Sequence, residues 1–96
     1  MVGKRIREAR LRTGLSQRRL GIKAGIDEFA ASPRINQYER GKHAPDFSTA
    51  ERLAKVLGVP VPYLYAREDH LADWILAFRA LTPKHRASVL RHAKRR

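Results

Sequence analysis

The chain has 96 residues, enough for one small domain with an appended segment, and 43% of them are apolar, so a packed core is expected. It has no cysteine, which excludes a disulfide scaffold and a thiolate metal site, and it shows neither the apolar stretch of a signal peptide nor a membrane span. Twenty-one Lys and Arg face nine Asp and Glu, and the resulting net charge of +12 predicts a polyanionic partner.

Glycines divide the first quarter of the chain into two predicted helices. A helix over residues 3–13 ends at Gly14, because glycine adopts the left-handed conformation without a Cβ clash. A second helix begins at Ser16, whose hydroxyl can accept a hydrogen bond from the first turn, and it ends at Gly25.

A third helix is predicted over residues 33–40, after a loop over residues 26–32. The pair Ser32-Pro33 is a typical helix start, because Ser supplies a capping oxygen and Pro at the first position lacks only an N–H that would be unpaired there. The predicted helix exposes polar side chains around a thin apolar anchor, whereas a purely structural helix has a wider apolar stripe. The polar residues are Arg34, Asn36, Gln37 and Arg40, and the anchor is Ile35 and Tyr38.

The second half of the chain is also predicted to be helical, and the expected fold class is therefore all-α. The elements are a helix over 46–57 capped by Asp46, a short turn over 60–65, a helix over 68–81 and a basic helix over 84–94 that follows Thr82-Pro83.

Three stretches of the sequence resemble the Cro/lambda-repressor-type helix-turn-helix family. They read IREARLRTGLSQRRLGIKAGI, INQYERGKHAPD and ERLAKVLGVPVPYLY, in that order. Together they lie within residues 3–65, about two thirds of the chain. The resemblance implies a five-helix lambda-repressor-like DNA-binding domain over residues 1–66, with the helix-turn-helix at about 16–41 and a C-terminal helical extension over 67–96.

The resemblance also implies which residues meet DNA. The helix over 33–40 would enter the major groove, Gln17 would contact a phosphate and steady that helix, and Glu39 would be tied to the scaffold. Gln37 can form a bidentate pair with adenine, and Arg34 can pair with guanine or a phosphate. The DNA-contacting residues implied are Gln17, Arg18, Ser32, Pro33, Arg34, Asn36, Gln37, Arg40, Lys42 and His43.

The sequence departs from the family pattern at four places. Pro33 stands where a polar base-reading residue is common, which removes one readout contact. The seven-residue segment 26–32 is longer than the usual turn of ~3–4 residues, so the third helix could be aimed differently, or Phe29 could pack and absorb the extra length. Gly21 replaces the usual alanine, and Arg19 replaces the Glu that would complete the capping box of Ser16.

The C-terminal extension has two open interpretations. Leu71, Trp74, Ile75 and Phe78 follow helical spacing, and they predict either core packing against the domain or the seam of a homodimer. Residues 79–96 hold seven Lys and Arg and no acid. The tail within them, KHRASVLRHAKRR, could form a second DNA contact, a solubilising helix or a surface for anionic lipid, and its narrow apolar face disfavours the lipid surface.

The function expected from these observations is that of a sequence-specific transcriptional regulator of prokaryotic or phage type. We expect a repressor that binds a palindromic double-stranded operator as a homodimer in the cytoplasm, associated with the nucleoid. The alternative is an antitoxin-like module that binds a partner protein through residues 68–96 and regulates itself through DNA. RNA binding is less favoured. No metal site is predicted, because the four His lack metal-ligand spacing. No membrane contact, catalytic residue or cofactor is predicted either.

Overall fold

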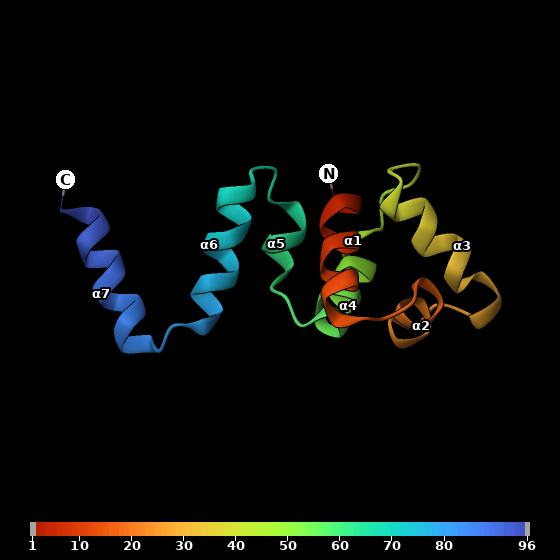
Figure 1. Cartoon of the computed structure of the whole chain (residues 1–96), viewed down its shortest axis with the longest axis horizontal. Helices are drawn as coiled ribbons and strands as arrows, with labels where there is room; N and C mark the ends of the chain where they lie inside the picture. Colours follow the sequence, from red (N-terminus) through yellow and green to blue (C-terminus); the bar gives the residue numbers. More distant parts are fainter. Residues whose placement is uncertain (1, 96) are drawn as a thin grey trace.

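The computed structural model describes residues 2–95, which form helices and connecting turns without any strand (Figure 1). This confirms the predicted all-α class. The helices are α1 (Val2–Thr13), α2 (Gln17–Lys23), α3 (Glu28–Glu39), α4 (Phe47–Leu57), α5 (Val61–Tyr65), α6 (Asp69–Ala80) and α7 (Pro83–Lys94).

The first five helices pack around one hydrophobic core. Each of them contributes one large aliphatic side chain with no exposed surface: Ile6, Leu20, Ile35, Leu53 and Leu64. Burying each such side chain contributes about 1.5–3 kcal/mol to the free energy of unfolding. The core is therefore shared by all five helices, as the family resemblance implied.

The third helix begins earlier than the sequence predicted. Its N-cap is Asp27, whose carboxylate accepts a hydrogen bond of 3.0 Å from the backbone N–H of Phe29, and Glu28 places a second acid in the first turn. The loop predicted over 26–32 and the start at Ser32-Pro33 were therefore wrong. Pro33 lies inside the helix, where its ring is exposed and the buried Ala31 and Ile35 hold the helix on either side of it in sequence.

The connection between α2 and α3 is consequently short. It consists of residues 24–27, which is the length usual for a helix-turn-helix. The predicted long turn does not exist, and Phe29 does not pack to absorb it, since 86% of its surface is exposed. The extra residues instead extend α3 by a turn at its N-terminal end.

Gly21 allows α2 and α3 to approach closely. A Cβ added at this position would lie 2.7 Å from the Cβ of Ala31, closer than two carbon atoms can pack. The glycine that departs from the family pattern is therefore required by the contact with α3, and the small side chain of Ala31 completes the fit.

The connection from α5 to α6 is held by Arg5, which is only 2% exposed. Its guanidinium donates hydrogen bonds to the carbonyl oxygens of Ala66 (2.9 Å) and Arg67 (3.2 Å), and it forms ion pairs with Glu8 and Asp69 at 3.0 Å each. Hydrogen bonds from Lys4 and Arg5 lower the pKa of the Asp69 carboxyl below its usual value.

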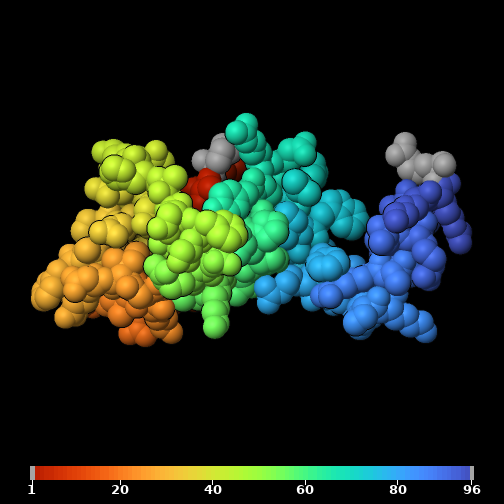
Figure 2. All heavy atoms as spheres, turned by 180° about the vertical axis from the view of Figure 1, so that it is seen from behind, coloured from red at the N-terminus to blue at the C-terminus, as the bar shows by residue number. Residues whose placement is uncertain are grey.

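The last two helices extend away from the core. The molecule measures 52 × 22 × 22 Å, and α7 forms a separate lobe at the end opposite α3 (Figures 1 and 2). Within α6 only Ala72 is buried, and α7 contains no buried residue. Core packing of the extension was therefore wrong for Leu71, Trp74 and Phe78, which are 47%, 65% and 52% exposed, whereas Ile75 is half-buried.

Candidate nucleic-acid interface

The orientation of α3 is fixed by an ion pair at its C-terminal end. Arg10 of α1 donates hydrogen bonds of 2.6 and 3.0 Å to the two carboxylate oxygens of Glu39, and Gln17 at the start of α2 donates one of 3.1 Å to the same group. The Glu39 side chain is 3% exposed, and its hydrogen bonds raise the pKa of Arg10 above its usual value. Three helices are thus joined at one carboxylate, which confirms the scaffold role expected for Glu39.

One side of α3 faces the core, and the opposite side is exposed at Phe29, Pro33 and Arg40 and half-buried at Asn36 and Gln37. The buried residues Ala31, Ile35 and Tyr38 follow the spacing i, i+4, i+7 of a single helix face. At about 100° per residue, the stripe directly opposite contains Phe29, Pro33, Asn36 and Gln37, and it continues to Arg40, the C-cap. We call these five residues the outer stripe.

The outer stripe offers groups that can meet base edges. Asn36 and Gln37 each carry an amide that can donate one hydrogen bond and accept another, Arg40 carries a guanidinium, and Phe29 presents an apolar ring. No acidic side chain belongs to the stripe. Glu28, which begins the helix, is paired with Arg18 of α2 at 3.0 Å, so its negative charge is partly compensated.

The other residues expected to meet DNA lie around this stripe. Ser32 is half-buried and Arg34 exposed, and both lie on the flanks of α3, while Lys42 and His43 are exposed in the loop that follows it. Gln17 is engaged with Glu39 and Arg18 with Glu28, so their side-chain hydrogen bonds already join α2 to α3. The structure therefore brings the predicted residues to one end of the molecule.

Three exposed residues of this end were missed by sequence reasoning. Phe29 was assigned to a loop, although Asp27 directly after Gly25-Ile26 was an available signal for an earlier helix start. Arg19 and Lys23 are exposed on α2 and border a shallow hollow of about 170 Å³. Their exposure and charge suit a phosphate backbone better than a base edge.

Within residues 2–95, none of the helices combines the length and the apolar character needed to cross a bilayer. Over the same residues, no group of three or more His, Asp or Glu side chains is placed to hold a metal ion.

Comparisons with known proteins match this geometry. The family model described as a helix-turn-helix domain matches residues 2–64. Two relatives, an uncharacterised HTH-type transcriptional regulator of Sinorhizobium medicae (strain WSM419) and the uncharacterised HTH-type transcriptional regulator R00410 of Rhizobium meliloti (strain 1021), are each 35% identical over 72 residues. That match covers 75% of this chain and 48% of either relative, so the chain spans about half their length.

A solved structure resembles the whole chain. The crystal structure of the transcriptional regulator BswR has a TM-score of 0.91 and 48% sequence identity, and the alignment covers 100% of this chain and 95% of that one. The similarity therefore includes α6 and α7 as well as the helix-turn-helix. The chain belongs to the helix-turn-helix family of transcriptional regulators.

Proposed function

We propose that the protein is a sequence-specific DNA-binding transcriptional regulator that inserts α3 into the major groove. The observation that carries this proposal is the outer stripe, a row of hydrogen-bonding and apolar groups opposite the buried face of α3, exposed at Phe29, Pro33 and Arg40 and half-buried at its two amides. The major groove of B-DNA is about 12 Å wide and admits one α-helix. The net charge of +12 supplies the sequence-independent attraction to phosphates.

Specificity in this proposal comes from three side chains of the outer stripe. Asn36 and Gln37 can each form a bidentate pair with adenine N6 and N7, and Phe29 can contact the methyl group of thymine. Arg40 lies at the end of the helix, where it reaches a phosphate more readily than a base. The site therefore favours operators rich in A·T pairs at the positions under α3.

The regulator acts as a repressor in this proposal, by occupying a palindromic operator as a homodimer. A single α3 reads only a few base pairs, too few for a useful specificity ratio in a genome. Two copies related by a two-fold axis would place their α3 helices about 34 Å apart, on half-sites separated by one helical turn. Nothing in this mechanism requires catalysis, a metal or a cofactor.

The test is selection of bound duplexes from a random pool, followed by sequencing. A palindromic consensus is expected, and Gln37→Ala should erase the preference at one position of each half-site, at a loss of about 1–3 kcal/mol of binding free energy. Lys42→Ala is the matched control, because it removes a phosphate contact and should weaken binding to all DNA sequences alike. Equal affinity for every duplex would refute specific binding, and an unchanged consensus for Gln37→Ala would refute the assignment of α3.

A further inference from the structure

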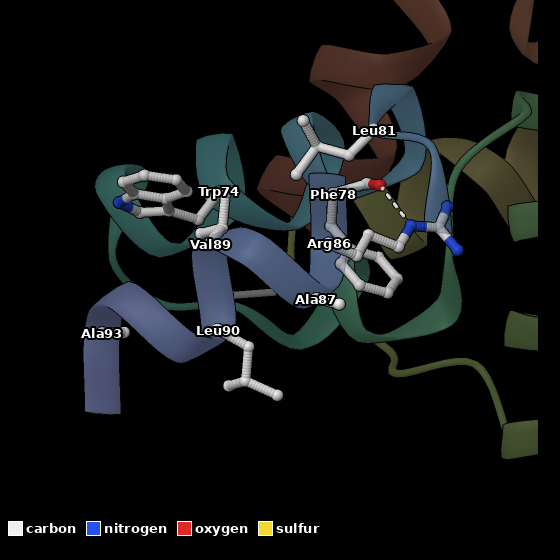
Figure 3. Close-up of a pocket in the computed structure, with 8 residues that line it drawn as sticks. All are labelled: Trp74, Phe78, Leu81, Arg86, Ala87, Val89, Leu90 and Ala93. Atoms are coloured by element: carbon white, nitrogen blue, oxygen red, sulfur yellow. Dashed lines mark hydrogen bonds between the residues drawn. The ribbon is translucent and has the colours of Figure 1, made fainter. Parts of the chain in front are cut away.

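An open apolar groove lies between α6 and α7. It has a volume of about 400 Å³ and is bordered by Trp74 and Phe78 from α6 and by Val89, Leu90 and Ala93 from α7 (Figure 3). In the single chain these side chains are left in water: Trp74 is 65%, Phe78 52% and Leu90 55% exposed. A contiguous apolar surface of this kind marks an interaction site.

The helix α7 has little support from its own chain. None of its residues is buried, and its tie to α6 runs through Arg86, which donates a hydrogen bond of 3.0 Å to the carbonyl oxygen of Phe78 and lies 4.1 Å over its ring. A helix of 12 residues without tertiary packing is marginal in water. A second apolar surface must therefore cover α7 for the helix to be stable.

The apolar face of α6 is open on its other side as well. A second groove, of about 420 Å³, is bordered by Pro60, Pro62 and Ile75, and again by Trp74 and Phe78. The same two aromatic rings thus separate two grooves along one helix. A helix from another molecule can lie along α6 while contacting both rings.

Charge distribution identifies the helix that fits there. Helix α6 with its N-cap has three acids (Glu68, Asp69 and Asp73) and one base, whereas α7 has four bases and no acid. The acids lie at the start of α6, and Arg91 and Lys94 lie at the end of α7. When an α7 runs antiparallel to an α6, these oppositely charged ends meet. Asp69 is already paired with Lys4 and Arg5, so Glu68 and Asp73 are the acids that remain for a partner. Of these two, Asp73 lies within α6 itself, whereas Glu68 is its N-cap.

We propose that the occupant of these grooves is a second copy of this chain, with α7 of each copy lying antiparallel along α6 of the other. Two α6–α7 pairs related by a two-fold axis then form a four-helix cluster, in which the residues bordering the grooves become a shared core and Asp73 faces Arg91 and Lys94 of the other copy. This inference rests on the proposed function at one point: the two-fold axis of the dimer is the axis that would relate the two α3 helices on the operator.

The single tryptophan makes this interface measurable. Trp74 is the only tryptophan of the chain, so its fluorescence reports on the groove alone. On dilution from micromolar to nanomolar protein without DNA, the emission maximum should move to longer wavelength as the sedimenting mass falls from dimer to monomer. Leu90→Asp should raise the dimer dissociation constant at least about tenfold. Leu11→Asp is the matched control, because Leu11 has the same 55% exposure on α1 and should leave the constant unchanged.

Mixing two variants distinguishes exchange between copies from pairing within one chain. Asp73→Lys, and separately Arg91→Glu combined with Lys94→Glu, should each weaken self-association, because like charges then meet twice in each dimer. An equimolar mixture should restore dimers, since every contact in the mixed dimer joins opposite charges. If the mixture stays monomeric while far-UV circular dichroism shows both variants folded, the exchange is refuted.

The wild-type result decides the occupant. A monomer at micromolar concentration with the emission of a water-exposed indole would refute the second copy and leave a partner protein, as an antitoxin-like module would have. A dimer that Leu90→Asp does not weaken would place the interface elsewhere and equally overturn the inference. Neither outcome touches the insertion of α3 into the major groove, because a monomer that still selects a single half-site from the random pool retains the function assigned to α3. A monomer would remove only the palindromic operator from the proposed function.

Discussion

Replacing Glu39 with glutamine should remove much of the stability of the protein. One carboxylate oxygen accepts the 2.6 Å bond from Arg10, and the other accepts bonds of 3.0 Å from Arg10 and 3.1 Å from Gln17. A glutamine keeps one acceptor oxygen, but its NH2 group would point at the N–H donors of Arg10 or Gln17. The substitution also removes the negative charge that pairs with the buried guanidinium of Arg10. Removing one partner of a buried ion pair costs about 3–5 kcal/mol.

This loss is large against the total stability expected for the chain. At about 0.05–0.15 kcal/mol per residue, 96 residues give a free energy of unfolding of about 5–14 kcal/mol. A domain of this size shifts its Tm by about 4–8 °C per kcal/mol, so Glu39→Gln should lower Tm by at least about 12 °C. The free energy itself is measured by urea unfolding, followed by far-UV circular dichroism.

Glu28→Gln is the matched control for this substitution. Glu28 also pairs with an arginine, Arg18, at 3.0 Å, but both side chains are more than half exposed. An exposed pair contributes only about 0–1 kcal/mol, so this variant should unfold close to the wild type. If Glu39→Gln were as stable as Glu28→Gln, the ion pair at the end of α3 would not hold the helix, and the reasoning would fail.

Three further substitutions test other parts of the structure. Gly21→Ala should destabilise the chain in urea unfolding, because overpacking against Ala31 costs about 1–3 kcal/mol and outweighs a gain of up to about 1 kcal/mol in helix propensity; a more stable variant would contradict the close contact. The backbone N–H of Thr49 donates a hydrogen bond to Asp46 and lowers the pKa of its carboxyl. The stabilisation of the fold by this carboxylate is therefore complete above the pKa of the unfolded chain and is lost as pH falls below about 4. Asp46→Ser keeps the capping oxygen without the titration, and its stability should fall less than that of the wild type on acidification; an equal fall would exclude Asp46 as the cause. Lys42→Ala should reduce the slope of log K against log salt for duplex binding by about 1, and an unchanged slope would remove Lys42 from the phosphate contacts.

Helix ends marked by a single capping residue were predictable from the sequence. Asp46 and Thr82 cap α4 and α7 as their side chains predicted, and Gly58 ends α4 in the left-handed conformation. The start of α3 was not predictable, because the sequence holds two possible capping residues, Asp27 and Ser32, five residues apart. The burial of Ala31 against Gly21 favours the earlier start, because Ala31 belongs to the helix only if the helix begins after Asp27. Periodicity within a short segment cannot show that contact.

The function of the apolar face on α6 was also beyond the sequence. The spacing of Leu71, Trp74, Ile75 and Phe78 is the same for a helix that packs into its own domain and for one that packs onto another molecule. The distinction depends on where the preceding connection directs α6. That direction is set by Arg5, which contacts residues more than sixty positions away in the chain.

Helix α1 determines the relative placement of the two surfaces proposed here. Arg10 holds the end of α3 through Glu39, and Arg5, five residues earlier on the same helix, holds the carbonyl oxygens of Ala66 and Arg67 before α6. Both contacts are largely buried and charge-assisted, so neither surface is connected to the core by a flexible linker. In a dimer joined through α6 and α7, the distance between the two α3 helices is therefore set by packed elements. A flexible connection would accept half-sites at many separations, whereas this one favours a single spacing.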